Sequence, residues 1–253
     1  MCLISFHWQP GSATPLTMAA NRDEFHARPA RPAQFWPEHP ELLAGQDLEA
    51  GGTWMGVTRE GRFAALTNVR QLPAPYEGEI SRGNLVKDFL TSNLAPETYL
   101  AQVHMNRLKY DGFNLVLGNR QECWYLNNRT EQAAIQLQPG LYGLSNAQLD
   151  SPWPKLEFAK DALSQWLKGL DSGSPNTELA TLLNRREPYP VNLLPNTGIG
   201  ETWEHLLSPP FIVSPQYGTR ASTGLQIHQQ EIEFKEVTMD AQGTAVNDVY
   251  FRF

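Results

Sequence analysis

Cys2 is the residue in this sequence that is best placed to act as a nucleophile. It follows Met1, and its small side chain permits removal of that methionine, which would leave a thiol and an α-amine on one residue. The α-amine has an ordinary pKa of roughly 7.7 to 8.0 and the thiol one of roughly 8.5. The amine could therefore accept the proton of its own thiol. The alternative is that Cys2 is a small buried residue of a first strand, which is a frequent role of a free cysteine.

The polar run Asn21-Arg22-Asp23-Glu24 is predicted to lie across a hairpin from Cys2. Two apolar stretches, residues 2–8 and 15–23, are separated by Gln-Pro-Gly-Ser, which favours a turn. With the turn near residues 12 and 13, facing residues have numbers that sum to about 25. Side chains alternate along a strand, so Asn21 and Asp23 share one face and Arg22 and Glu24 the other. Asp23 is the carboxylate expected to hold the Cys2 ammonium group.

Composition and charge indicate an ordinary globular protein. The 253 residues are 41% hydrophobic and 19% charged, and we expect one domain over residues 1–253. The net charge of −7 argues against nucleic acid or an anionic membrane as the main partner. There is no apolar run of spanning length, no secretory leader, and too few cysteines (2) for a disulfide framework. The sequence therefore predicts a cytoplasmic protein.

Strands and helices are predicted in separate blocks of the chain. Strand patterns occur at 62–68, 113–118, 122–127, 142–146, 219–228, 231–239 and 246–253, and helical patterns at 81–91, 96–106, 153–170 and 176–184. This arrangement favours an α+β fold with antiparallel sheets covered by helices over a doubly wound parallel sheet. The Pro- and Asn-rich stretch 186–210 is predicted to be a long loop near a site. The six histidines have no metal-ligand spacing, so no metal site is predicted.

Five motifs in combination resemble the NRDE family, which includes the transport and Golgi organisation protein 2 group. They are Met1-Cys2-Leu3-Ile4, Asn21-Arg22-Asp23-Glu24-Phe25, Gly52-Thr53-Trp54-Met55-Gly56-Val57, Leu144-Ser145-Asn146 with Pro152-Trp153-Pro154-Lys155, and Tyr217-Gly218-Thr219-Arg220-Ala221-Ser222-Thr223. That family in turn resembles the N-terminal nucleophile (Ntn) hydrolases of the choloylglycine hydrolase and acid ceramidase branch. The resemblance implies a four-layer αββα sandwich with two antiparallel sheets.

The resemblance also implies a set of site residues. Cys2 is the nucleophile, Asp23 the aspartate of the motif, Asn68 and Asn146 the asparagines that form or support an oxyanion hole, and Arg220 a late arginine near the nucleophile; Asn21, Arg22 and Glu24 complete the motif. Ordinary structural roles remain open for three of them. Asn68 and Asn146 could instead bond backbone groups at strand ends, and Arg220 could form a structural ion pair with Asp23 or Glu24.

One position departs from the hydrolase pattern. Ala20 stands where the related hydrolases carry arginine, and the nearest cation, Arg22, is displaced and expected on the opposite face. The departure puts hydrolysis in question and leaves the fold unaffected.

Two functions follow as expectations. The first is a cysteine hydrolase, with Cys2 as nucleophile, that acts on an amide or thioester of a hydrophobic acyl compound and requires no cofactor. The second is a non-catalytic protein that binds haem or lipid, because members of the family have been linked to haem trafficking and lipid homeostasis. Haem as cargo would need an apolar slot and an axial ligand, for which His7 and His26 are candidates. The sequence leaves the oligomeric state, the substrate and the removal of Met1 open.

Overall fold

Two antiparallel sheets form the centre of the molecule. The computed structural model describes residues 2–70, 72, 74, 78–171 and 178–253. The six-stranded sheet has the order β10-β1-β2-β11-β12-β13, with β1 Cys2–Trp8, β2 Leu16–Phe25, β10 Gly140–Leu144, β11 Tyr217–Ile227, β12 Ile232–Met239 and β13 Ala245–Arg252. The seven-stranded sheet runs from β3 to β9 in sequence order, with β3 Ala30–Trp36, β4 His39–Asp47, β5 Met55–Thr58, β6 Phe63–Asn68, β7 Phe113–Gly118, β8 Cys123–Asn127 and β9 Ile135–Gln136.

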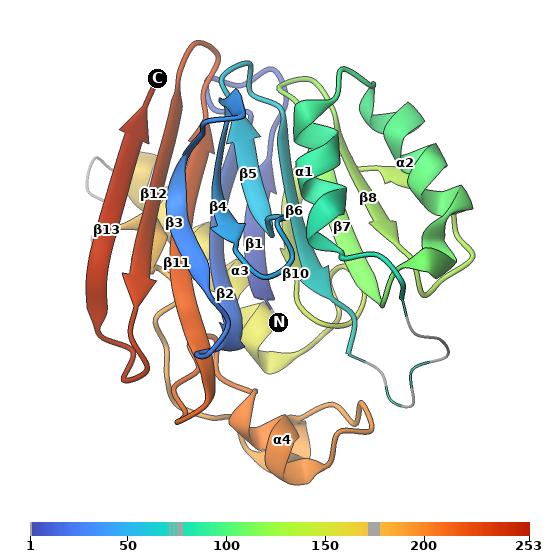
Figure 1. Ribbon diagram of the computed structural model, residues 1–253. Helices are drawn as coiled ribbons and strands as arrows, with labels where there is room; N and C mark the ends of the chain where they lie inside the picture. Colours follow the sequence, from blue (N-terminus) through green and yellow to red (C-terminus); the bar gives the residue numbers. More distant parts are fainter. Residues whose placement is uncertain (1, 71, 73, 75–77, 172–177) are drawn as a thin grey trace.

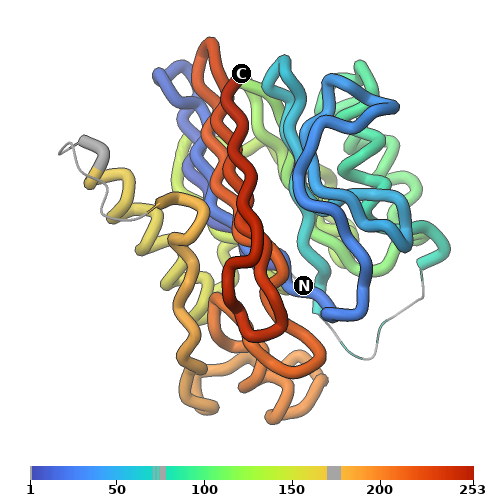
Figure 2. Tube along the Cα trace, turned by 60° about the vertical axis from the view of Figure 1, so that its left-hand side comes forward, coloured from blue at the N-terminus to red at the C-terminus, as the bar shows by residue number. Residues whose placement is uncertain are grey.

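Helices cover the outer faces of the two sheets. The described helices are α1 Gly83–Thr91, α2 Pro96–Met105, α3 Pro154–Asp171 and α4 Glu201–Leu206, with short 3-10 helices η1 Arg107–Lys109, η2 Leu179–Thr181 and η3 Val191–Leu193; α4 lies below the sheets in Figure 1. Figures 1 and 2 show α1 and α2 on the seven-stranded sheet and α3 on the six-stranded sheet. The predicted four-layer αββα sandwich is confirmed. Within the described residues no helix is both long and apolar enough to cross a membrane.

Alternation along β1 and β2 divides their side chains between two cores. Ile4, Phe6 and Trp8 are buried between the sheets, whereas Leu3 and Ala19 pack on the other face against α3. A strand buried on both faces reads as a continuous apolar run rather than an alternating one. The first hairpin is therefore fixed at the centre of the sandwich.

Most of the predicted elements are present, with ends that differ by a few residues. The helix predicted over 176–184 is wrong where the structure describes it, because residues 178–184 hold only the short η2, and residues 176 and 177 lie outside the described residues. The predicted loop 186–210 contains η3 and α4. Four strands, β3, β4, β5 and β9, were not predicted.

Candidate active site

A cavity of about 340 Å³ opens between the two sheets at the end where β1 begins. Cys2 lines it, together with five arginines and six carboxylates: Arg22, Arg28, Arg31, Arg82, Arg220, Asp23, Glu24, Asp47, Glu79, Asp111 and Glu236. Leu66 and Trp54 supply part of its apolar wall. The lining is thus rich in charge, whereas the sequence predicted a ligand of hydrophobic character. No residue of the stretch 186–210 is among those that line it.

Cys2 lies directly opposite Arg22 in the β1–β2 ladder. Their numbers sum to 24, so the register obtained by counting the hairpin from the sequence is confirmed to within one residue. Directly opposed residues of an antiparallel pair project to the same face, which here is the face between the sheets. The expectation that Arg22 lies on the face away from the nucleophile was therefore wrong. Ala20 lies on that same face, one alternation further from Cys2 and opposite Ile4.

The thiol of Cys2 is held in its protonated form at neutral pH. The residue is 5% exposed, and burial raises the pKa of its thiol to about 11, with the charges of Asp23 and Glu24 raising it and that of Arg22 lowering it. A thiol is a poor nucleophile compared with its thiolate. Attack by Cys2 therefore requires a base at the site.

Asp23 lies on the neighbouring face of β2, towards α3. Its Oδ1 accepts a hydrogen bond of 2.7 Å from Thr219 Oγ1, and the hydroxyl of Tyr217 donates to its backbone oxygen at 2.9 Å. Burial raises the pKa of the Asp23 carboxyl, and the ammonium group of Lys155 opposes that rise. Asp23 also contributes to the cavity lining. The charge of Asp23 raises the pKa of the Cys2 thiol, although the two side chains project to opposite faces of the sheet.

The side chain of Asn21 has a structural role, because it bonds the loops beside the site. Its side chain is 1% exposed, donates to the backbone oxygens of Leu183 (3.1 Å) and Pro210 (2.9 Å), and accepts from Ser222 Oγ (2.7 Å). Both amide hydrogens and the amide oxygen are thus engaged. Asn21 fastens two loops to the sheet beside the site and does not line the cavity.

Glu24 shares the inner face of β2 with Arg22 and lines the cavity. Arg22 Nη2 and Glu24 Oε2 are 3.9 Å apart, at the limit of an ion pair. Glu24 Oε1 accepts the backbone N–H of Phe25 at 2.9 Å. The motif thus places one cation and one anion on the same side as the thiol.

The two predicted oxyanion asparagines have different surroundings. Asn68, the last residue of β6, lines the cavity, and its side-chain amide makes no hydrogen bond with any described residue. Asn146 is fully buried, and its Nδ2 donates to the backbone oxygen of Asn68 at 3.0 Å. Asn146 thus holds Asn68 in place and does not itself line the cavity.

Arg220 occupies a bulge where the β2–β11 register shifts. Its Nη1 lies 3.0 to 3.2 Å from the backbone oxygens of Phe25, His26 and Arg28. Within the described chain it forms no ion pair with Asp23 or Glu24, so the structural ion pair considered for it is absent. Arg220 lines the cavity and fixes the backbone that follows β2.

The two histidines considered as ligands for haem lie outside the cavity lining. His7 is opposite Thr17 in the β1–β2 ladder. His26 donates from Nε2 to the backbone oxygen of Ser214 at 3.0 Å. A molecule bound in this cavity would therefore not be held by either imidazole.

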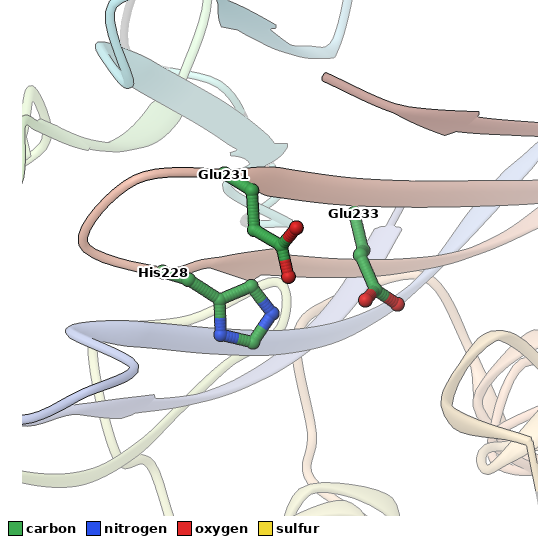
Figure 3. Close-up of side chains that lie close together, drawn as sticks. All are labelled: His228, Glu231 and Glu233. Carbon is green, nitrogen blue, oxygen red and sulfur yellow. The ribbon is translucent and has the colours of Figure 1, made fainter.

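His228, Glu231 and Glu233 form a cluster at the β11–β12 turn (Figure 3), with ligand atoms within 4.8 Å of one another. The cluster is far from Cys2, because Ala221 and Thr238, which lie in line with Cys2 across the sheet, are at the other end of β11 and β12. Arg252 already pairs with Glu231 through two contacts of 2.8 and 2.9 Å. Since an arginine compensates this carboxylate, the cluster needs no cation.

Three charged residues of the site and its surroundings were missed by sequence reasoning. Arg82 precedes α1, lines the cavity and interacts electrostatically with Cys2 and Glu24. Lys155 at the start of α3 is buried, donates to the Leu207 backbone oxygen at 3.1 Å, and has a pKa lowered by burial to about 8. Glu236 of β12 is a buried carboxyl in the cavity wall. Only Lys155 carried a signal, because it belongs to the motif Pro-Trp-Pro-Lys.

Comparisons with known proteins agree with the family resemblance. The family model described as Transport and Golgi organisation 2 matches residues 1–241. The chain is 37% identical over 243 residues to the Transport and Golgi organization protein 2 homolog of Homo sapiens, which covers 88% of this chain and 87% of that protein.

Two solved structures are similar to this chain at a low level. A Caenorhabditis elegans N-acylethanolamine-hydrolyzing acid amidase ortholog superimposes with a TM-score of 0.47 and 11% identity, over 88% of this chain and 92% of that one. The C2A mutant of the conjugated bile acid hydrolase from Clostridium perfringens gives 0.42 and 8%, over 99% and 97%. At these values the two likenesses say nothing about catalysis in this chain.

Proposed function

This chain belongs to the Transport and Golgi organisation 2 family, and from the geometry around Cys2 we propose that it is a cysteine hydrolase of amides or thioesters of an acyl compound. The observation that carries the proposal is the position of the Cys2 thiol. It lies on the inner face of the sheet, in a cavity, opposite the guanidinium of Arg22 and in the same cavity wall as the unengaged amide of Asn68. A nucleophile and a hydrogen-bond donor for the oxyanion are groups that acyl transfer uses, and the α-amine of Cys2 would be the base.

The reaction would proceed in two stages. After removal of Met1, the α-amine of Cys2 takes the thiol proton, and the thiolate sulfur forms a bond to the carbonyl carbon. Asn68 donates a hydrogen bond to the oxyanion, a contribution of roughly 3 to 4 kcal/mol for a well-placed donor. The carbon–nitrogen or carbon–sulfur bond breaks as the ammonium returns the proton to the leaving group. Water then attacks the acyl-cysteine thioester, which releases the carboxylic acid and restores the thiol.

The first test is the intact mass of the purified protein before and after brief treatment with a thiol-directed acylating reagent. We expect loss of Met1 and rapid acylation at Cys2, abolished by Cys2→Ala and unchanged by Cys123→Ala. Cys123 is an internal control because it is buried between the sheets and burial raises the pKa of its thiol strongly. Retention of Met1, or acylation of Cys2 no faster than that of Cys123, would contradict the proposal.

A second test measures turnover directly. A panel of amides and thioesters is incubated with the protein, and release of the carboxylic acid is followed by mass spectrometry. Turnover that Cys2→Ala abolishes supports the hydrolase.

A binding protein without turnover is the second candidate, and a specific observation favours it. The Cys2 thiol has a pKa of about 11, and Ala20 faces the space between the sheets where related hydrolases carry arginine. In this alternative, haem or a lipid would occupy the cavity, with the Cys2 sulfur as the candidate axial ligand for haem. Titration with haem and acyl ligands, compared between the wild type and Cys2→Ala, tests it.

Both cysteines are free and buried, which suits the reducing cytoplasm expected for this protein.

A further inference from the structure

We propose that the cavity contains a second subsite, built around Glu236, that binds an amine carried by the acyl substrate. The inference rests on the proposed function for the reacting end of that substrate, and concerns the opposite end. It names the substrate class as an acyl compound with a positively charged amino group remote from its scissile carbonyl.

The six-stranded sheet places Glu236 far from Cys2 within the same cavity. The inner-face row that begins at Cys2 continues through Arg22 and Ala221 to Thr238. This row spans three strand spacings of about 4.8 Å, or roughly 14 Å. Glu236 precedes Thr238 by two residues on β12 and therefore shares its face. The cavity thus has a thiol at one end and a carboxyl at the other.

Glu236 is held as a buried group whose second oxygen is available. The residue is 3% exposed, and Oε1 accepts the backbone N–H of Ala33, from the other sheet, at 2.7 Å. With the described residues, Oε2 makes no hydrogen bond and the carboxyl makes no ion pair. A Cβ built on Gly45 would lie 3.7 Å from Oε2, so this glycine leaves space beside the oxygen. Burial of an unpaired carboxylate is costly, which makes such a group a candidate for binding a cation.

A second polar group beside Glu236 also lacks a partner. Thr223 of β11 is directly opposite Glu236, is fully buried, and its Oγ1 makes no hydrogen bond to a described residue. Thr223 is not among the residues that line the cavity, so the acceptor presented to an ammonium group is the carboxylate oxygen of Glu236.

The charge of the cavity lining favours a cation. The lining carries six carboxylates and five guanidinium groups, with Glu24, Glu236, Arg22 and Arg220 on this sheet. Arg22 lowers the pKa of Glu236, which burial raises to about 7. Arg31 on the facing strand β3 has an exposed side chain. An ammonium group at Glu236 would balance the one carboxylate by which the lining exceeds its guanidinium groups.

The test compares two probes, ω-aminododecanamide and dodecanamide, which differ only in the terminal amine. Binding is measured by calorimetry on Cys2→Ala protein, so that no turnover is needed. We expect the amino compound to bind at least tenfold more tightly at pH 8. Glu236→Gln should remove that preference, and Gly45→Ala should reduce it by filling the space beside Oε2. The preference should also weaken at pH 6, below the pKa of about 7 of Glu236, where its carboxyl is protonated.

Glu79→Gln is the matched control, because Glu79 lines the same cavity but is exposed. Glutamine at 236 retains the acceptor for the Ala33 N–H, and thermal unfolding of each variant verifies its fold. Equal affinity for the two probes, or a preference that survives Glu236→Gln, would overturn the subsite. If the preference is observed and the wild-type protein hydrolyses no amide or thioester of the panel, the subsite stands and the hydrolase alone is refuted.

Discussion

Cys2 and Arg22 face each other directly across the β1–β2 ladder, on the surface between the two sheets. The motif Asn-Arg-Asp-Glu therefore divides its residues between two tasks. Arg22 and Glu24 project into the cavity with the thiol, whereas Asn21 and Asp23 project towards α3 and the loops that cover it. One strand thus carries both the charges of the site and the bonds that hold its surroundings.

Arg22 should control the reactivity of Cys2. A thiol pKa of about 11 leaves about one thousandth of Cys2 as thiolate at pH 8, so its alkylation rate should rise about tenfold per pH unit up to pH 10. The N-terminal ammonium group and Arg22 both lower this pKa; Arg22→Gln removes the second of these cations and should slow alkylation at pH 9 by roughly three- to tenfold. Iodoacetamide labelling followed by mass spectrometry measures the rate. Arg31→Gln is the control, and an equal slowing in that variant would contradict the assignment to Arg22.

Asn21 should matter chiefly for stability. In Asn21→Ala, the backbone oxygens of Leu183 and Pro210 and the hydroxyl of Ser222 lose their partner in a buried position. We expect the free energy of unfolding to fall by about 2 to 4 kcal/mol. Urea denaturation provides the measurement, with Asn247→Ala on exposed β13 as the comparison. A loss below that of Asn247→Ala would show that these bonds contribute little.

The hairpin was predictable because its register depends on local sequence alone. Two apolar strands and one Pro-Gly turn fix which residues oppose Cys2. Strands β3 and β4 were missed because each contains a proline, Pro32 and Pro40, which argues against a strand. The structure accommodates Pro32 on the edge strand β3, where the register shifts between Arg31 and Gln34.

The rest of the cavity wall depends on which strands meet across the sandwich. Arg82 and Glu236 are 80 or more residues from Cys2 in the sequence, and each reads there as an ordinary surface charge. Glu236 follows Ile232 and Phe234 at the two-residue spacing of a strand, which places it on their buried face, but the local sequence does not show which group bonds its carboxyl. Packing of β12 against β3 decides it, through the Ala33 N–H.

Glu236 should make stability depend on pH in a direction opposite to that of most carboxyls. Its pKa is raised by burial from 4.5 to about 7, so between these values the folded protein keeps a proton that the unfolded chain releases. This contribution is fully present below pH 4.5 and is lost as the pH rises through 7, at most roughly 3 kcal/mol. Glu236→Gln should therefore become more stable relative to the wild type between pH 5 and 8. Urea denaturation across that range tests it; a parallel pH dependence in both proteins, with Glu79→Gln as reference, would refute it.

Asn68 and Asn146 should separate catalysis from stability. Asn68 lines the cavity, and its side-chain amide has no partner among the described residues. Asn68→Ala should therefore lower kcat for an amide or thioester by roughly 10²- to 10³-fold, with little change in the unfolding midpoint. Asn146 is buried and bonds the Asn68 backbone oxygen, so Asn146→Ala should cost about 1 to 3 kcal/mol of unfolding free energy. Steady-state kinetics and urea denaturation of both variants decide the matter. An Asn68 variant that turns over at the wild-type rate would remove Asn68 from the oxyanion role, and an Asn146 variant of normal stability would show that the bond to the Asn68 backbone oxygen contributes little.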